Sequence, residues 1–93
     1  MTVNHDQDNK NFYIQVGLER AELSYRFSDD GVFDLYRTHV PEEGRGQGLA
    51  KMLVDAAIVY IRGQNGRVRP SCSYVEKYFE KHPELKDLRS GPL

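Results

Sequence analysis

The chain has 93 residues, a formal net charge of −1 and one cysteine. This length allows one modest hydrophobic core rather than two, so we expect a single domain. The sequence pI of about 6.3 argues against nucleic acid as the main partner, because nucleic-acid-binding domains are usually basic. A lone cysteine excludes an internal disulfide and suits a reducing compartment, so we expect the protein in the cytoplasm.

Membrane and metal-dependent functions are also disfavoured by the residue pattern. No apolar run approaches the roughly 20 residues that span a membrane, and the start of the chain lacks a signal-peptide pattern. The cysteine and the histidines are scattered without close pairing, so no metal site is expected.

The first half of the chain predicts an antiparallel meander of three strands. Residues 1–10 are polar and are interpreted as a flexible tail before a single domain over residues 11–93. Alternating apolar residues predict strands over residues 11–17, 21–27 and 32–40. The segment from Ser28 to Gly31 is typical of the hairpin turn between the last two of them.

The second half predicts a helix, a strand and a second helix. Apolar residues three and four positions apart predict a helix over residues 48–64. Residues 67–72 predict a short strand, parallel to the third one because a helix connects the two. Residues 73–82 predict the second helix, in which Ser73 and Glu76 have the spacing of a capping box.

The first predicted helix carries more apolar residues than one face can hold. The residues that widen its stripe are Ala56, Ile58, Val59 and Ile61. Either they extend the core beneath the second helix, or some of them form a weak homodimer contact on an otherwise monomeric protein.

A glycine-rich segment joins the third predicted strand to the first helix. Gly44, Gly46 and Gly48 fall at every second position, and Arg45 adds a positive charge. Glycine lets the backbone approach a ligand closely, and the first N–H groups of a helix, having no partner within it, bind anions. Because the spacing fits neither the P-loop nor the dinucleotide fingerprint, we expect a different phosphate-containing ligand.

The cysteine lies directly before the second predicted helix. A helix N-terminus lowers the pKa of a thiol, and the thiolate is its reactive form, which would make Cys72 a functional residue. A lone cysteine is also a common packing residue in protein cores. Position alone leaves both interpretations open.

Two motifs together indicate a family. Arg45, Gly48 and Ala50 match the pattern Gln/Arg-x-x-Gly-x-Gly/Ala, which resembles the acetyl-CoA pyrophosphate loop of the GNAT superfamily of acyl-CoA-dependent N-acyltransferases. With the later segment from Cys72 to Tyr78, the chain resembles a family of very short, single-domain GNAT-like proteins. The resemblance implies an α/β (α+β) fold of GNAT type, acetyl-CoA or CoA as the cosubstrate, and an amine acceptor.

The resemblance also implies site residues. The cofactor-binding residues expected from it are Thr38, His39, Val40, Arg45, Gly46, Gln47, Gly48, Leu49, Ala50, Lys51, Cys72 and Tyr78. The cysteine before the last helix is the proposed catalytic residue of the family, which is Cys72 here. His39 is interpreted as a general base, because free histidine has a pKa of about 6.5; alternatively it is only a partly exposed strand residue.

The chain departs from ordinary GNAT domains at the general acid. Those domains carry an Asn at the place of Cys72 and, seven residues later, a Tyr, whereas this chain has Phe79, which cannot donate a proton. Cys72 would then either accept the acyl group or protonate the CoA thiolate.

The short connection over residues 17–20 leaves the acceptor side open, which suits a protein or peptide amine. An acyl-CoA-binding module without turnover and a protein-interaction domain remain alternatives.

Overall fold

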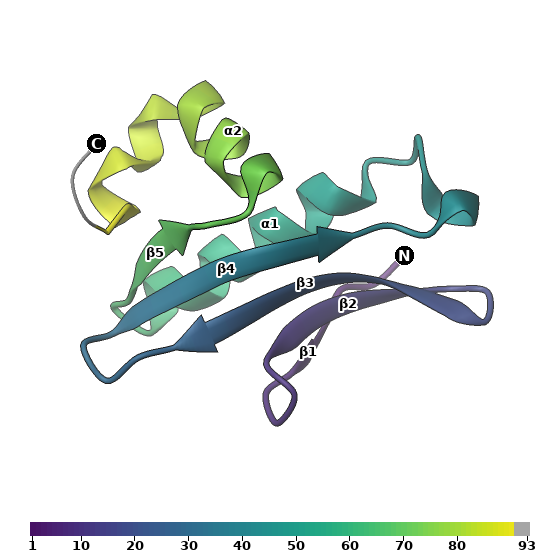
Figure 1. Cartoon of the computed structure of the whole chain (residues 1–93), viewed down its shortest axis with the longest axis horizontal. Coiled ribbons are helices and arrows are strands. Elements are labelled where there is room, and N and C mark those ends of the chain that lie inside the picture. Colours follow the sequence, from purple (N-terminus) through teal and green to yellow (C-terminus); the bar gives the residue numbers. More distant parts are fainter. Residues whose placement is uncertain (91–93) are drawn as a thin grey trace.

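The computed structural model describes residues 1–90 as one five-stranded sheet with its helices on one face (Figure 1). The strands are β1 (Asn4–Asp6), β2 (Asn11–Val16), β3 (Glu19–Phe27), β4 (Val32–His39) and β5 (Arg67–Pro70). The helices are α1 (Leu49–Gly63) and α2 (Ser73–Lys81), with the short 3₁₀ helices η1 (Glu42–Gly44) and η2 (Pro83–Leu88). Neighbours from β1 to β4 pair antiparallel, and β5 pairs parallel with β4. The expected mixed α/β class and the helix–strand–helix order are confirmed.

The N-terminal segment is not the flexible tail that its polarity predicted. Residues 4–6 form β1 and extend the meander to four strands. The cause is one inward side chain: the His5 ring stacks on Phe12 with centroids 4.0 Å apart and meets the edge of Tyr60 at 4.4 Å. His5 Nε2 also lies 2.7 Å from the Tyr25 hydroxyl. The half-buried imidazole, together with Val3, which packs against the core, therefore holds the edge strand. Residues 91–93 of the expected domain lie outside the described residues.

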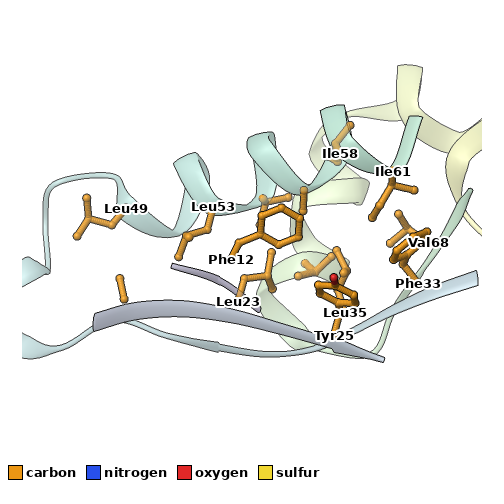
Figure 2. Close-up of a cluster of buried hydrophobic side chains, with 14 of the residues drawn as sticks. Phe12, Leu23, Tyr25, Phe33, Leu35, Leu49, Leu53, Ile58, Ile61 and Val68 are labelled. Atoms are coloured by element: carbon orange, nitrogen blue, oxygen red, sulfur yellow. The ribbon is translucent and has the colours of Figure 1, made fainter. Parts of the chain in front are cut away.

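The core lies between α1 and the inner face of the sheet (Figure 2). Figure 2 shows Leu53 and Ile61 of α1 directed toward the strands, where Leu23 and Leu35 are fully buried. Burial at roughly 25 cal/mol per Å² makes this contact the main stabilising term of the fold. The register that it imposes decides which strand residues face the helices and which face away.

The broad apolar stripe of α1 is explained mostly by the core. Ile58 is 7% exposed and Ile61 is fully buried, Ala56 is half-buried, and only Val59 is largely exposed, at 73%. Ile58 and Ile61 are therefore not available for a dimer contact, and a weak contact through the remaining residues stays a prediction. The extended-core alternative is confirmed for Ile58 and Ile61.

A β-bulge interrupts β4 before its end. Tyr25 of β3 is opposite Leu35, but the preceding residue Ser24 is opposite Arg37, so Tyr36 is the extra residue. A bulge re-aims the side chains that follow it. Thr38, opposite the buried Leu23, consequently faces the helices, whereas Arg37 and His39 face the other side of the sheet.

The second helix starts differently from the capping box that its sequence predicted. Cys72, with extended backbone angles, is the N-cap residue, and no side chain makes a capping hydrogen bond. Ser73 is therefore the first helical residue, one position too late to cap. Glu76 turns instead to Arg89, whose Nη2 donates to both of its carboxylate oxygens at 2.9 Å. The predicted capping box is wrong.

Candidate functional site

The glycine loop leaves the first turn of α1 without any capping group. Gly48 is the N-cap, with φ +72°, and Gly46 also has a positive φ of +80°. A Cβ at either position would meet nothing within 4 Å, so the glycines serve the backbone conformation and leave open space above it. No side chain caps α1, and no acidic residue lies in its first turn. The free N–H groups at this helix start have the character of groups that bind anions.

A hollow of about 260 Å³ lies on this loop. Its lining consists of residues 44–46 and 48–51, with Val40 from the end of β4 and Tyr74 from α2. A second hollow of about 270 Å³ shares Lys51 and Tyr74 with the first and continues along α2. The second one is bordered by the cationic side chains of Lys77 and Lys81. The two together form a groove that runs from the glycine loop along the space between α1 and α2, which we call the helix groove.

Cys72 lies where β4, β5 and α2 meet. Its N–H donates to the Leu35 carbonyl at 3.0 Å, which ends the parallel pairing of β4 with β5. Its Sγ lies 3.2 Å from Thr38 Oγ1, on the helix side of the sheet. The bulge creates this contact, because unbroken alternation from Leu35 would have directed Thr38 to the opposite face. Beyond Leu35 the edge of β4 is no longer paired with β5.

The surroundings of Cys72 favour its ionised form. Burial raises the pKa of the thiol, but the Thr38 hydroxyl and the backbone N–H groups of Val75 and Tyr74 outweigh it, so the net pKa is lowered. Those N–H groups belong to the first turn of α2, which has no side-chain cap. They are therefore left to stabilise a thiolate, as helix N-termini do for reactive cysteines.

The tyrosine next to Phe79 is not available as a proton donor. Phe79 is 5% exposed and belongs to the core. The Tyr78 hydroxyl donates to Asp55 of α1, and burial together with that carboxylate raises the pKa of Tyr78 well above its ordinary value. Asp55 also accepts from Lys51 Nζ at 2.9 Å. Tyr78 thus joins the two helices beside the helix groove and keeps its proton.

The structure brings some of the expected cofactor-binding residues together and separates others. Those lining the glycine-loop hollow are Val40, Arg45, Gly46, Gly48, Leu49, Ala50 and Lys51. Tyr78 lines the second hollow, whereas Thr38 and Cys72 form their own contact. Gln47 donates to the Glu43 carbonyl at 3.1 Å and is turned back onto the loop. His39 lies on the opposite face of the sheet, across from Glu22.

Comparison with known proteins identifies the family of this chain. The family model described as GCN5-related N-acetyl-transferase matches residues 11–88. The chain belongs to the GCN5-related N-acetyltransferase family. Protein NATD1 of Mus musculus is 31% identical over 83 residues, which cover 87% of this chain and 76% of that protein. Protein NATD1 of Danio rerio is 29% identical over 90 residues, covering 95% and 82%.

A solved structure shows the same fold. The solution NMR structure of a GCN5-like protein from Staphylococcus aureus has a TM-score of 0.77 and 29% identity, and covers 99% of this chain and 90% of that one. The GNAT-like fold expected from the sequence is therefore confirmed. Within residues 1–90, no helix has the length and apolar character to cross a membrane. The same residues contain no group of three or more metal-ligating side chains.

Several features of this GCN5-related domain were not found from its sequence. Tyr74, shared by both hollows, was not among the expected site residues. Asp55 was not considered, although it accepts from Lys51 and Tyr78. Its position four residues after Lys51 was a readable signal for the first of these bonds. The contact of Thr38 with Cys72 depends on the bulge, for which no local signal was identified.

Proposed function

We propose that this protein is an acetyl-CoA-dependent N-acetyltransferase in which Cys72 carries the acetyl group between CoA and an amine. The observation that carries the proposal is the position of the Cys72 thiol, 3.2 Å from the Thr38 hydroxyl at the uncapped start of α2. Family membership supports the use of acetyl-CoA in general terms.

The helix groove has the features that CoA requires. The pyrophosphate would lie on the free N–H groups of α1 over residues 46–50, where the glycines leave open space. The nucleotide end would then follow the groove past Tyr74, toward Lys77 and Lys81, whose charges suit its additional phosphate. The pantetheine arm would reach Cys72 along the unpaired edge of β4, where strand-like hydrogen bonds can hold its amides.

The lowered pKa of Cys72 favours the acyl-acceptor role over the acid role. The Cys72 thiolate attacks the acetyl carbon, an S–C bond to Cys72 forms, and the S–C bond to CoA breaks, with CoA leaving as a thiolate that takes a proton from solvent. The neutral amine then attacks the acetylated Cys72, a C–N bond forms, and the Cys72 thiolate returns. A low thiol pKa serves both steps, because it raises the thiolate fraction and improves the leaving group.

His39 is the proposed acceptor-side base. It follows Thr38 in β4 but faces the opposite side of the sheet, across from Glu22. An amine that approaches from that side could pass its proton to the imidazole after attack. The single thiol and this thiolate chemistry suit a reducing compartment, so we propose the cytoplasm as the place of action.

The test compares wild-type protein with Cys72→Ala and Ser71→Ala, the latter altering an exposed neighbour. Initial rates of acetyl transfer to a lysine peptide are measured together with CoA affinity by calorimetry. We expect Cys72→Ala to lose transfer by roughly a hundredfold or more while CoA affinity stays within about twofold, as for a covalent nucleophile. Ser71→Ala should match wild type. Transfer by Cys72→Ala at the wild-type rate would contradict the covalent role.

A CoA-binding module without turnover is the second candidate, favoured by the buried Phe79 in place of a phenol. The same experiment separates the two functions. CoA binding with no transfer to any amine by wild-type protein would support the binding module.

A further inference from the structure

One face of the sheet carries no helix. Figure 1 shows α1 behind the strands, with no helix of the described chain on the near side. The strand residues that face away from α1 are only partly buried or exposed, among them Tyr13, Ser24 and Arg26. We call this surface the outer face. It extends over all five strands of the sheet.

The outer face is basic and its cations are arginines. Arginines 20, 26, 37, 67 and 69 lie in strands and are exposed, whereas every lysine in residues 1–90 lies outside the strands. The acidic strand residues on this face are fewer. Asp6 is opposite Asn11, Glu22 is opposite His39, and Asp34 is 3.8 Å from Arg26. The chain as a whole has a net charge of −1, so positive charge is concentrated on this face. Arginine offers a planar fork that matches a carboxylate.

Two of the guanidinium groups are held flat on the sheet. Arg20 lies over the Tyr13 ring and Arg26 over the Tyr36 ring, each 3.9 Å from the ring centroid. Stacking restricts these long side chains before any ligand arrives, which lowers the entropy lost on binding. Their N–H edges remain available for hydrogen bonds in the plane of the face.

The outer face reaches the reaction centre through β4. Thr38 contacts Cys72 on the helix side, and the residues before and after it, Arg37 and His39, face outward. The helix groove occupies the other side, so an acceptor that meets an acyl group on Cys72 approaches from the outer face. The pairing of β4 with β5 ends at Leu35, which leaves an open edge beside Thr38 for this approach.

We infer that the acceptor is an amine in an acidic protein segment, which lies across the outer face with its carboxylates on Arg20, Arg26 and Arg37. This inference rests on the proposed function, because it names the acceptor class of the same site. Carboxylates close to the lysine in sequence would pair with Arg37, next to His39. Those further away would reach the stacked Arg26 and Arg20.

The test uses the full-length protein without CoA and two labelled peptides of equal length. One has a central lysine flanked by glutamates, and the other has glutamines in their place. Fluorescence anisotropy should show the glutamate peptide binding roughly tenfold more tightly, because several exposed charge pairs each contribute modestly. The preference should shrink as salt is raised.

A matched pair of variants tests whether the glutamate peptide binds to the outer face. Arg37→Glu should weaken the glutamate peptide roughly fivefold and leave the glutamine peptide unchanged. Lys86→Glu makes the same change of charge on an exposed residue of η2 and should alter neither affinity. The melting temperatures of both variants are measured first. If Arg37→Glu fails to fold, Arg20→Glu takes its place with the same expectation.

Three binding results would each overturn the inference: equal affinity for the two peptides, equal loss in the two variants, or tighter binding of a labelled oligouridine than of the glutamate peptide. The oligouridine result would assign the outer face to single-stranded nucleic acid. Acetylation of the two peptides with the same kcat/KM would also overturn it. Acetylation of neither peptide, with the binding preference intact, would contradict the proposed function and still support an acidic partner on the outer face.

Discussion

The two helix starts of this domain use the same backbone groups for different purposes. At α1, Gly48 caps the helix with no side chain at all, and the space above its first turn is open. At α2, Cys72 occupies the cap position, and the N–H groups of the first turn lower the pKa of its thiol. Tyr74 borders the hollow of the first site and belongs to the first turn of the second. The start of α1 is suited to an anion of a bound ligand, whereas the start of α2 stabilises the thiolate of the protein's own Cys72.

The largest effect should come from closing the open start of α1. Gly48→Glu places a carboxylate where the pyrophosphate would lie, so CoA affinity should fall by roughly a hundredfold or more, since juxtaposed like charges cost several kcal/mol. The positive φ at this position is also unfavourable for a residue with a side chain, which destabilises the fold by about 1–2 kcal/mol. Calorimetry with CoA provides the measurement.

The control for this variant is Gly63→Glu, at the last residue of the same helix. A Cβ there meets nothing within 4 Å, and its φ is not positive. It adds the same side chain at the end that does not bind anions, so CoA affinity should remain. Equal loss of CoA affinity in both variants would contradict the assignment of an anion site to the start of α1.

A smaller effect should come from removing the hydroxyl that stabilises the Cys72 thiolate at the start of α2. Thr38→Val keeps the shape of the side chain but removes the hydroxyl that stabilises the Cys72 thiolate, so the pKa of Cys72 should rise. Alkylation by iodoacetamide follows the thiolate, and its midpoint should move to higher pH than in wild type. Thr38→Ser keeps the hydroxyl and should leave the midpoint in place.

The lowered thiol pKa also has a consequence for stability. A group whose pKa is lower in the folded state stabilises the fold above its unfolded pKa, and this contribution is lost as pH falls through the folded value. Cys72 should therefore contribute more to stability in mildly alkaline than in neutral solution. The difference between wild type and Cys72→Ala in urea unfolding should widen with pH up to the ordinary cysteine pKa, and a constant difference would contradict the shift.

The smallest effect is expected from replacing Ser73, the residue next to the N-cap Cys72. Because Ser73 is the first helical residue and makes no capping bond, Ser73→Ala should change the free energy of unfolding by no more than about 0.5 kcal/mol. A true N-cap serine would cost about 1 kcal/mol. Glu76→Ala, which breaks the pair with Arg89, should cost about 1 kcal/mol. Urea unfolding compares the two variants. A larger loss of unfolding free energy in Ser73→Ala than in Glu76→Ala would support the capping box that the sequence predicted.

The sequence predicted the elements that have a long and regular pattern. Alternation placed β2, β3 and β4, and the stripe of α1 placed the main helix, because each buries one face against the other. It missed β1, where three polar residues are held by the single inward ring of His5. It also assigned the cap of α2 to Ser73, which has capping-box spacing to Glu76, whereas the N-cap is Cys72, whose N–H is held by the Leu35 carbonyl.

The site was predictable where it is continuous in sequence. The glycine loop could be recognised from its spacing together with its place between a strand and a helix, and all of its residues except Gln47 line one hollow. The contact of Thr38 with Cys72 joins residues far apart in the chain and depends on the extra residue Tyr36 in β4. Simple alternation would have placed Arg37 and His39 on the helix side with Leu35. The bulge reverses this order. It directs Thr38 toward Cys72 on the helix side and turns Arg37 and His39 to the outer face.

The most direct test of the central claim is to observe acetyl on Cys72 itself. Protein is mixed with acetyl-CoA without an acceptor, quenched in acid, digested and analysed by mass spectrometry. The account predicts one acetyl group on the peptide that contains Cys72, its disappearance when a lysine peptide is added before quenching, and no acetylated species in Cys72→Ala. Transfer to the lysine peptide at full rate, with Cys72 unmodified at every time point, would contradict it.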